Sequence, residues 1–285
     1  MSIVEPLAIF SGHSECRSLD ETIPVLSHVL ALEVVDRGDK QVTMKHVNTG
    51  WLLVVHEGDP DAPDKPERNH FGVRVSNNEE VDRAYAYLLA EKEKLGLKKV
   101  VKRKERKGSY SLFFMEPGGN YWEIESYEIR AKSGLPKDVA FPWQKPFVSE
   151  DFSARGYTPQ AFTHGTIECV DLAASVKFYK DGLGLDVITH VPGVIPHDMK
   201  HPDLPWYVVS LQVPEHKHKL LGPLQRFTIT VASLAKLAEA RENFQTAQDE
   251  FGLWEIGALE DIDGGQSFLL SDRDKNWWEI AYLQS

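Results

Sequence analysis

The sequence contains little cysteine and no long apolar run. Only two cysteines, Cys16 and Cys169, occur among 285 residues, so a disulfide framework is excluded as the basis of the fold. No apolar stretch reaches the roughly 20 residues that a membrane-spanning helix needs. The first residues also lack the basic and then apolar segment of a secretory signal. We therefore expect a cytoplasmic protein with free thiols and no membrane partner.

Basic residues are fewer than acidic ones. The chain has 32 Lys and Arg against 43 Asp and Glu, which gives a formal net charge of -11. A negative surface of this kind repels phosphate backbones, so nucleic acid is excluded as a main partner. With 42% hydrophobic residues, the chain is long enough for two domains that each bury a core. A small molecule or another protein is the partner that this composition favours.

The sequence repeats itself in three segments that occur in the same order. In the two closing segments, GGNYWEIESY and DKNWWEIAY, Glu123 matches Glu279 and Asn120 matches Asn276, an offset of 156 residues. The same offset aligns residues 69–88 with 225–244, and an offset of 153 aligns residues 15–34 with 168–187. Three segments in one order with small drifts in offset indicate a tandem duplication.

A segment rich in proline and polar residues separates the two copies. Residues 132–160 show no periodic pattern and are interpreted as a linker. We predict a first domain over residues 1–131 and a second over residues 161–285. Within each copy, an order of strand, helix and strands occurs twice, which predicts two βαβββ units per domain.

Residues 69–127 illustrate this pattern in the first copy. Residues 71–75 alternate as a strand, residues 79–95 have the spacing of a helix, and residues 121–127 form a last strand after a Pro-Gly-Gly turn. Alternation on the last strand places Glu123 and Tyr121 on one face and turns Trp122 and Ile124 to the other. The aromatic neighbour therefore packs in the core while the glutamate faces away from it.

Two motifs carry a resemblance to a known family. The segment HGTIECVDLAASVKFYKDGLGLDV from His164 resembles the opening unit of the vicinal oxygen chelate superfamily, and EPGGNYWEI from Glu116 resembles its closing hairpin. That superfamily includes glyoxalases, bleomycin-resistance proteins and extradiol dioxygenases. The resemblance implies an α+β fold with tandem vicinal-oxygen-chelate domains, in which pairs of βαβββ units form half-open barrels. Each barrel is then a cup in which a metal and a substrate can meet.

The resemblance also implies where the metal ligands lie. They come from the first strand of each unit and the last strand of the second, which in the first copy are His13, His70 and Glu123. An ungapped alignment of the copies places Ser11 rather than His13 over His164, so the choice between them stays open. Two imidazoles and one carboxylate form the facial triad suited to Fe(II), with Mn(II) or another divalent metal as alternatives.

The second copy differs at one of these positions. It keeps His164 and Glu279, but Arg226 stands where the first copy has His70. A guanidinium offers no lone pair to a metal, so we expect Arg226 to pair with Glu279 and the second cup to hold no metal.

The acid–base group is less clearly marked. Phe113 occupies the position at which the resemblance implies a tyrosine in extradiol enzymes. His56, His46 and Tyr121 are the remaining candidates for proton transfer.

Three functions are compatible with these residues. The first is an extradiol-type ring-cleaving dioxygenase that binds a catecholic or related aromatic substrate and O2. The second is a glyoxalase-like isomerase or lyase, whose sites commonly use four protein ligands. The third is a metal-free module that sequesters a small molecule, similar to bleomycin-resistance proteins. The resemblance is also compatible with a homodimer.

Overall fold

The computed structural model describes residues 2–106, 108–188, 197–201 and 205–284. The chain forms two compact units, and each consists of segments from both copies. One unit comprises residues 14–165, and the other, which we call the split unit, comprises residues 1–13 and 166–285. Among the described residues, no helix has the length and apolar character needed to cross a membrane.

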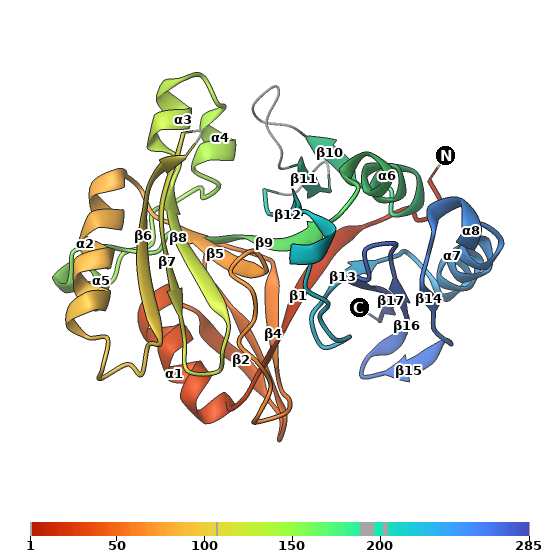
Figure 1. The fold of residues 1–285 in the computed structure, drawn as a ribbon, viewed down its shortest axis with the longest axis horizontal. Coiled ribbons are helices and arrows are strands. Elements are labelled where there is room, and N and C mark those ends of the chain that lie inside the picture. The colour runs from red at the N-terminus through yellow and green to blue at the C-terminus, as the bar shows by residue number, and fades with distance from the viewer. Residues whose placement is uncertain (1, 107, 189–196, 202–204, 285) are drawn as a thin grey trace. The chain divides into compact units, whose positions relative to one another are not determined.

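Four βαβββ units follow one another along the chain, which confirms the predicted fold class (Figure 1). The first consists of β1 (Ala8–Cys16), α1 (Leu19–Leu30), β2 (Glu33–Arg37), β3 (Gln41–Lys45) and β4 (Leu52–Glu57). The second consists of β5 (His70–Arg74), α2 (Asn78–Ala90), β6 (Lys99–Arg106), β7 (Ser109–Met115) and β8 (Tyr121–Ser126). The third consists of β9 (Ala161–Cys169), α6 (Leu172–Lys177) with a π-helical turn (Phe178–Gly182), β10 (Asp186–Ile188), β11 (His197–Lys200) and β12 (Tyr207–Gln212). A 3-10 turn (Glu215–Lys217) leads to the fourth, which consists of β13 (Arg226–Thr230), α7 (Leu234–Thr246), α8 (Gln248–Phe251), β14 (Glu255–Ile256), β15 (Glu260–Ile262), β16 (Gly265–Ser271) and β17 (Trp277–Leu283).

The helices α2 and α7 form for the same local reasons. Asn77 caps α2 by accepting a hydrogen bond from the Glu80 N–H, and Ser233 caps α7 by accepting one from the Lys236 N–H. Each helix buries three apolar residues at helical spacing: Val81, Ala84 and Leu88 in α2, and Leu237, Ala240 and Phe244 in α7. These positions are related by the repeat offset of 156, and α2 lies along one face of β6, β7 and β8 (Figure 1).

The repeated asparagine has a structural role in both copies. Asn120 donates from its amide to the Glu15 carbonyl at 3.0 Å, and Asn276 donates to the Glu168 carbonyl at 2.9 Å. A buried acid closes each hairpin, because Glu116 accepts from the Asn120 N–H and Asp272 from the Asn276 N–H. These bonds attach the closing hairpin of each copy to the first strand of the same copy.

Each cup contains the first strand of the other copy. Strand β5 pairs in parallel with β8 and antiparallel with β9, while β13 pairs in parallel with β17 and antiparallel with β1. Strand β9 is the first strand of the second copy, and it therefore forms a cup with strands of the first. The compact units consequently differ from the predicted division into residues 1–131 and 161–285, since their boundaries fall inside β1 and β9.

The predicted linker packs within the 14–165 unit. It contains the short helices α3 (Glu128–Lys132), α4 (Lys137–Ala140) and α5 (Glu150–Arg155). The side chain of Asn48 donates to the Gln160 carbonyl at 2.9 Å, and the Phe147 N–H donates to the Gln160 side chain at 2.8 Å. Residues 132–160 are thus an ordered part of this unit, held by hydrogen bonds to its strands and loops.

Candidate metal centre

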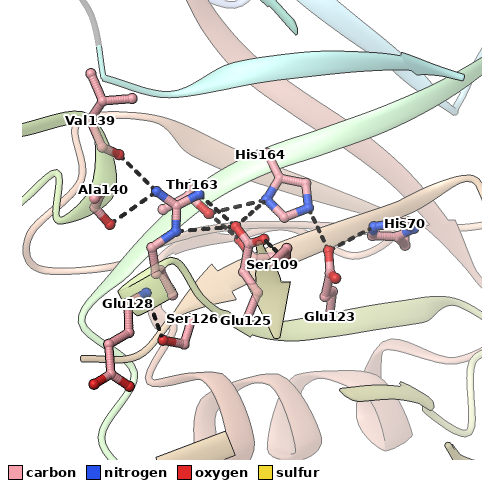
Figure 2. Close-up of polar contacts among 12 residues, drawn as sticks. His70, Ser109, Glu123, Glu125, Ser126, Glu128, Val139, Ala140, Thr163 and His164 are labelled. Carbon is pink, nitrogen blue, oxygen red and sulfur yellow. Dashed lines mark hydrogen bonds and ion pairs between the residues drawn. The ribbon is translucent and has the colours of Figure 1, made fainter. Parts of the chain in front are cut away.

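Three buried side chains of the 14–165 unit converge on one point. They are His70 on β5, Glu123 on β8 and His164 on β9, and their ligand atoms lie within 4.8 Å of one another. Glu123 Oε2 lies 3.2 Å from His70 Nε2 and 3.0 Å from His164 Nε2. Figure 2 shows the Glu123 carboxylate between the two imidazole rings. Two imidazole nitrogens and a carboxylate oxygen form a donor set that suits a divalent metal.

Strand register explains why these side chains meet. In the parallel pair of β5 and β8, Gly72 lies opposite Glu123, and His70 is two residues earlier on the same face of β5. In the antiparallel pair of β5 and β9, Gly72 also lies opposite His164. A Cβ atom at position 72 would come within 2.2 Å of His164 Cε1, so the imidazole of His164 lies over the strand only because residue 72 is glycine.

The second nitrogen of each imidazole has its own partner. His70 Nδ1 lies 2.7 Å from the Glu67 carbonyl, which can only accept, so Nδ1 carries a proton and Nε2 is the nitrogen that faces Glu123. His164 Nδ1 lies 3.1 Å from Thr163 Oγ1 and 3.4 Å from Glu125 Oε1. Histidines that bind metals through Nε2 are commonly fixed in this way through Nδ1. The residues present therefore fit a metal that is held by two Nε2 atoms and one carboxylate.

Neighbouring groups shift the pKa values of both Glu123 and His164. Burial by itself would raise the pKa of Glu123, but hydrogen bonds from His164 and His70 outweigh it and hold the pKa well below its usual range. Burial by itself would lower the pKa of His164, but the charge of Glu125 and the hydrogen bond to Glu123 raise it to about 9. Without a metal, the site is therefore an ion pair between a carboxylate and an imidazolium.

The cluster of His70, Glu123 and His164 does not include His13, which was predicted as a metal ligand. This residue lies on β1 in the split unit, with Nε2 2.8 Å from Thr228 Oγ1, 3.0 Å from Ser11 Oγ and 3.7 Å from Glu279 Oε2. The cluster of ligand groups contains His164 instead. The physical reason is the exchange of first strands, which places β9 beside β5 and β1 beside β13.

The cup of the split unit is filled by hydrogen bonds between protein groups. Glu279 Oε2 accepts from Arg226 Nε at 3.2 Å and from Thr228 Oγ1 at 2.7 Å, and Oε1 accepts from Ser267 Oγ at 2.9 Å. The predicted pairing of Arg226 with Glu279 is thus confirmed. Ser11 lies opposite Thr228 as His164 lies opposite Gly72, so Ser11 is the structural counterpart of His164.

Both ring nitrogens of His46 lie beside backbone groups. Its Nε2 lies 3.1 Å from the Pro159 carbonyl, and its Nδ1 accepts from the Asn48 N–H at 3.1 Å. Burial lowers the pKa of His46 to about 4, so the ring is neutral at pH 7. With both nitrogens bonded to backbone groups, His46 joins the loop after β3 to the segment before β9, and its role in proton transfer stays a prediction.

The other acid–base candidates lie on different strands. Tyr121 lies on β8 opposite His70, on the face that also carries Glu123, and its side chain is only 6% exposed. His56 is buried on β4, opposite Gln41 on β3. Phe113, at the position where a tyrosine was expected, packs edge-on against the His70 ring with centroids 4.9 Å apart. Of these residues, Tyr121 stands on the strand that carries the carboxylate ligand.

Sequence reasoning missed two residues of this cluster: His164, whose imidazole faces Glu123, and Gly72, which leaves room for that ring. The ungapped alignment of the copies contained the signal, because it placed Ser11 over His164. The offset of 156 places Thr228 over Gly72, so the cup with the larger residue on β13 has the smaller partner, Ser11, on the opposite strand.

Comparisons with known proteins agree with this fold. Residues 16–124 match the model of the Glyoxalase/Bleomycin resistance protein/Dioxygenase superfamily. A protein from Bacillus subtilis subsp. subtilis str. 168, provisionally named a dioxygenase, is 13% identical with a TM-score of 0.63, and the match covers 99% of this chain and 87% of that one. A glyoxalase I variant from Zea mays is 14% identical with a TM-score of 0.64, over 96% of this chain and 92% of that one. No curated protein matches the sequence. The resemblance to the vicinal oxygen chelate superfamily is thus confirmed over residues 16–124. The solved structures show that the likeness in fold alone extends over nearly the whole chain.

We predict that Gly72→Ala weakens metal binding. The added methyl group occupies the space of the His164 ring and forces the ring away from Glu123. The dissociation constant for Mn(II), measured by calorimetry, should rise by about 100-fold or more, since displacement of a ligand costs at least as much as the loss of a supporting group. Gly38→Ala is the control, because a Cβ atom there meets only the Gln41 carbonyl at 3.8 Å. A Gly72→Ala protein that binds Mn(II) as tightly as the wild type would contradict the assignment of His164.

We also predict that metal binding releases a proton at neutral pH. The folded-state pKa of His164 is raised to about 9, so the metal-free protein keeps this proton until the pH rises through about 9. The protonated His164 ring stabilises the folded protein through its carboxylate partners. This stabilisation is fully present below the pKa of about 6.5 that histidine has in the unfolded chain, and it is lost as the pH rises through about 9. Metal must displace the proton, so affinity should increase about tenfold per pH unit between pH 7 and 9. Calorimetry in buffers of different ionisation enthalpy should give about one proton released per metal at pH 7, and no release would contradict the ion pair.

Proposed function

We propose that this protein is a metal-dependent dioxygenase of the extradiol type, which cleaves the ring of a catecholic or related aromatic substrate with O2. Fe(II), or alternatively Mn(II), would be held by His70, Glu123 and His164. The observation that supports this proposal is the convergence of two Nε2 atoms and one carboxylate oxygen within 4.8 Å in a buried cup. This two-histidine, one-carboxylate set is typical of non-haem Fe(II) oxygenases.

His70, Glu123 and His164 would hold a ferrous ion, which would supply Lewis-acid and oxygen chemistry to a catecholic substrate. The protein groups contribute orientation and charge. The Glu123 carboxylate compensates part of the positive charge, and the Nδ1 partners of both histidines fix the direction of their lone pairs. All three ligand side chains are at most 10% exposed, so the cup excludes most bulk water from the reacting atoms.

An apolar wall beside the ligands suits an aromatic ring. Phe113, Met115 and Tyr121 form a cluster of buried residues, and all three are at most 8% exposed. Phe113 lies opposite Glu123 and Met115 lies opposite Tyr121 in the pairing of β7 with β8, so the cluster is on the face of the sheet that carries the carboxylate ligand. Apolar and aromatic walls with a few polar groups are typical of sites that bind small molecules.

Tyr121 is the group best placed to exchange a proton with the substrate. Lys99 Nζ lies 5.9 Å from the centroid of the Tyr121 ring, and the nearby phenol raises the pKa of Lys99. A phenol O–H can both donate and accept, so Tyr121 can give its proton to a substrate oxygen. Tyr121 thereby assumes the acid–base role that the expected tyrosine at position 113 would have had.

The two alternative functions are less well supported. A glyoxalase-like site commonly uses a fourth protein ligand, and the cluster found among residues 2–106, 108–188, 197–201 and 205–284 has three members. A metal-free binding module has no need of two buried histidines that turn their Nε2 atoms toward one carboxylate. Both alternatives remain distinguishable by metal content and oxygen consumption.

The proposal predicts the metal content of four proteins purified anaerobically. Wild type and His13→Ala should contain about one Fe or Mn per chain by mass spectrometry, because His13 bonds to Ser11 and Thr228 and not to the ligand cluster. His70→Ala and His164→Ala should contain little, because each loses one of three ligands. Wild type loaded with Fe(II) should consume O2 with at least one member of a catechol panel.

Two results would contradict this proposal. Loss of metal in His13→Ala with retention in His164→Ala would favour the ligand set predicted from sequence. Full metal occupancy without O2 consumption on any catechol would exclude ring cleavage and favour an isomerase or lyase.

The role of Tyr121 gives a separate prediction. Tyr121→Phe should lower kcat by about 100-fold or more while metal content stays at the wild-type level, since general acid–base groups contribute roughly 10²- to 10⁴-fold. Tyr110→Phe is the matched control, because the Tyr110 hydroxyl donates to Asp82 on α2 at 2.7 Å. Equal kcat values for wild type and Tyr121→Phe would show that the proton moves through another group.

A further inference from the structure

A fully buried ion pair lies directly behind His164. Arg74 on β5 is 0% exposed and Glu125 on β8 is 2% exposed, with Arg74 Nη2 2.6 Å and Nε 3.2 Å from Glu125 Oε1. Arg74 Nη1 donates to the Val139 carbonyl at 2.9 Å and to the Ala140 carbonyl at 3.3 Å. The guanidinium also stacks over the Tyr127 ring, 3.5 Å from its centroid.

Stability alone does not account for this pair. Removing two charges from water is costly, and well-packed apolar residues in place of a buried ion pair are often neutral or stabilising. The chain nevertheless keeps both charges at full burial, with backbone carbonyls of α4 and the Tyr127 ring to hold the guanidinium. A role beyond packing is therefore expected.

The second cup provides an internal comparison. Arg74 lies opposite Glu125 in the pairing of β5 with β8, and the repeat offset of 156 places Thr230 and Ala281 at the same opposed positions of β13 and β17. That cup has Ser11 where the first has His164. The ion pair therefore occurs in the cup that contains the imidazole and is replaced by uncharged residues in the cup that does not.

The carboxylate contacts His164 on the side opposite the ligand cluster. Glu125 Oε1 lies 3.4 Å from His164 Nδ1, while Nε2 of the same ring lies 3.0 Å from Glu123 (Figure 2). Ser109 donates to the other oxygen, Glu125 Oε2, at 3.2 Å. An ionised carboxylate is an acceptor only, so Glu125 requires the proton of His164 on Nδ1 and leaves Nε2 for a metal.

We infer that Glu125, held by Arg74, is a positioning residue of the metal site that fixes the tautomer and orientation of His164 and strengthens its bond to the metal. This inference rests on the metal-binding part of the proposed function. Carboxylates that support a ligating histidine typically contribute a factor of about 10 to 100 in metal affinity.

The test uses the full chain, stripped of metal and titrated with Co(II), whose visible absorption reports the ligand field. Glu125→Gln keeps the shape and removes the charge, and it should weaken Co(II) binding by about 10- to 100-fold and shift the visible bands. Glu116→Gln is the matched control, since Glu116 is also a buried carboxylate of this unit but bonds to Thr22, Gly118 and Asn120. It should bind Co(II) with the wild-type affinity and spectrum.

A second variant separates positioning from folding, because Glu125→Gln leaves Arg74 buried without its anion and destabilises the protein. The double variant Arg74→Met with Glu125→Leu removes both charges, so its melting temperature should be nearer to that of the wild type. If Glu125 positions His164, the double variant still binds Co(II) about 10- to 100-fold more weakly.

Three outcomes would overturn the inference. Wild-type affinity in Glu125→Gln, or recovery of wild-type affinity in the double variant, would reduce the pair to a structural role while the proposed function stands. A wild-type chain that binds no Co(II) would overturn the proposed function together with this inference, so the two failures are distinguishable.

Discussion

The antiparallel pairing of β9 with β5 is the constraint on which the site depends. It places the His164 ring over Gly72, where a side chain of any other residue would occupy the space of the imidazole. In the other cup the same pairing, between β1 and β13, places the small Ser11 opposite Thr228. One backbone geometry therefore occurs twice, and the size of the residue on β5 or β13 decides whether an imidazole can enter the cup.

The repeated glutamate shows how a common position acquires two roles. Glu123 meets two imidazoles whose other nitrogens have partners, so its charge is available to a metal. Glu279 accepts hydrogen bonds from Arg226, Thr228 and Ser267, which supply from the protein the positive charge and donors that an ion would supply. A buried carboxylate requires such compensation in either cup. The repeated asparagine, in contrast, performs the same structural role in both copies.

Much of this arrangement could be predicted from the sequence, because its signals are local. Helical spacing, strand alternation and the repeat offset predicted four βαβββ units, and the alternation around Glu123 predicted which face carries it. The choice of His13 over His164 depended on which strands pair across the repeats, and such pairing has no local signal. The alignment of Ser11 with His164 was the available indication, and it acquires its meaning only once β9 is known to lie beside β5.

Anomalous diffraction from crystals of the protein soaked with Mn(II) tests the central claim most directly. The account predicts one strong peak in the 14–165 unit, about 2.1 Å from Nε2 of His70 and of His164 and from a carboxylate oxygen of Glu123. A peak beside Glu279 in the split unit, or no peak in either cup at saturating Mn(II), would contradict it.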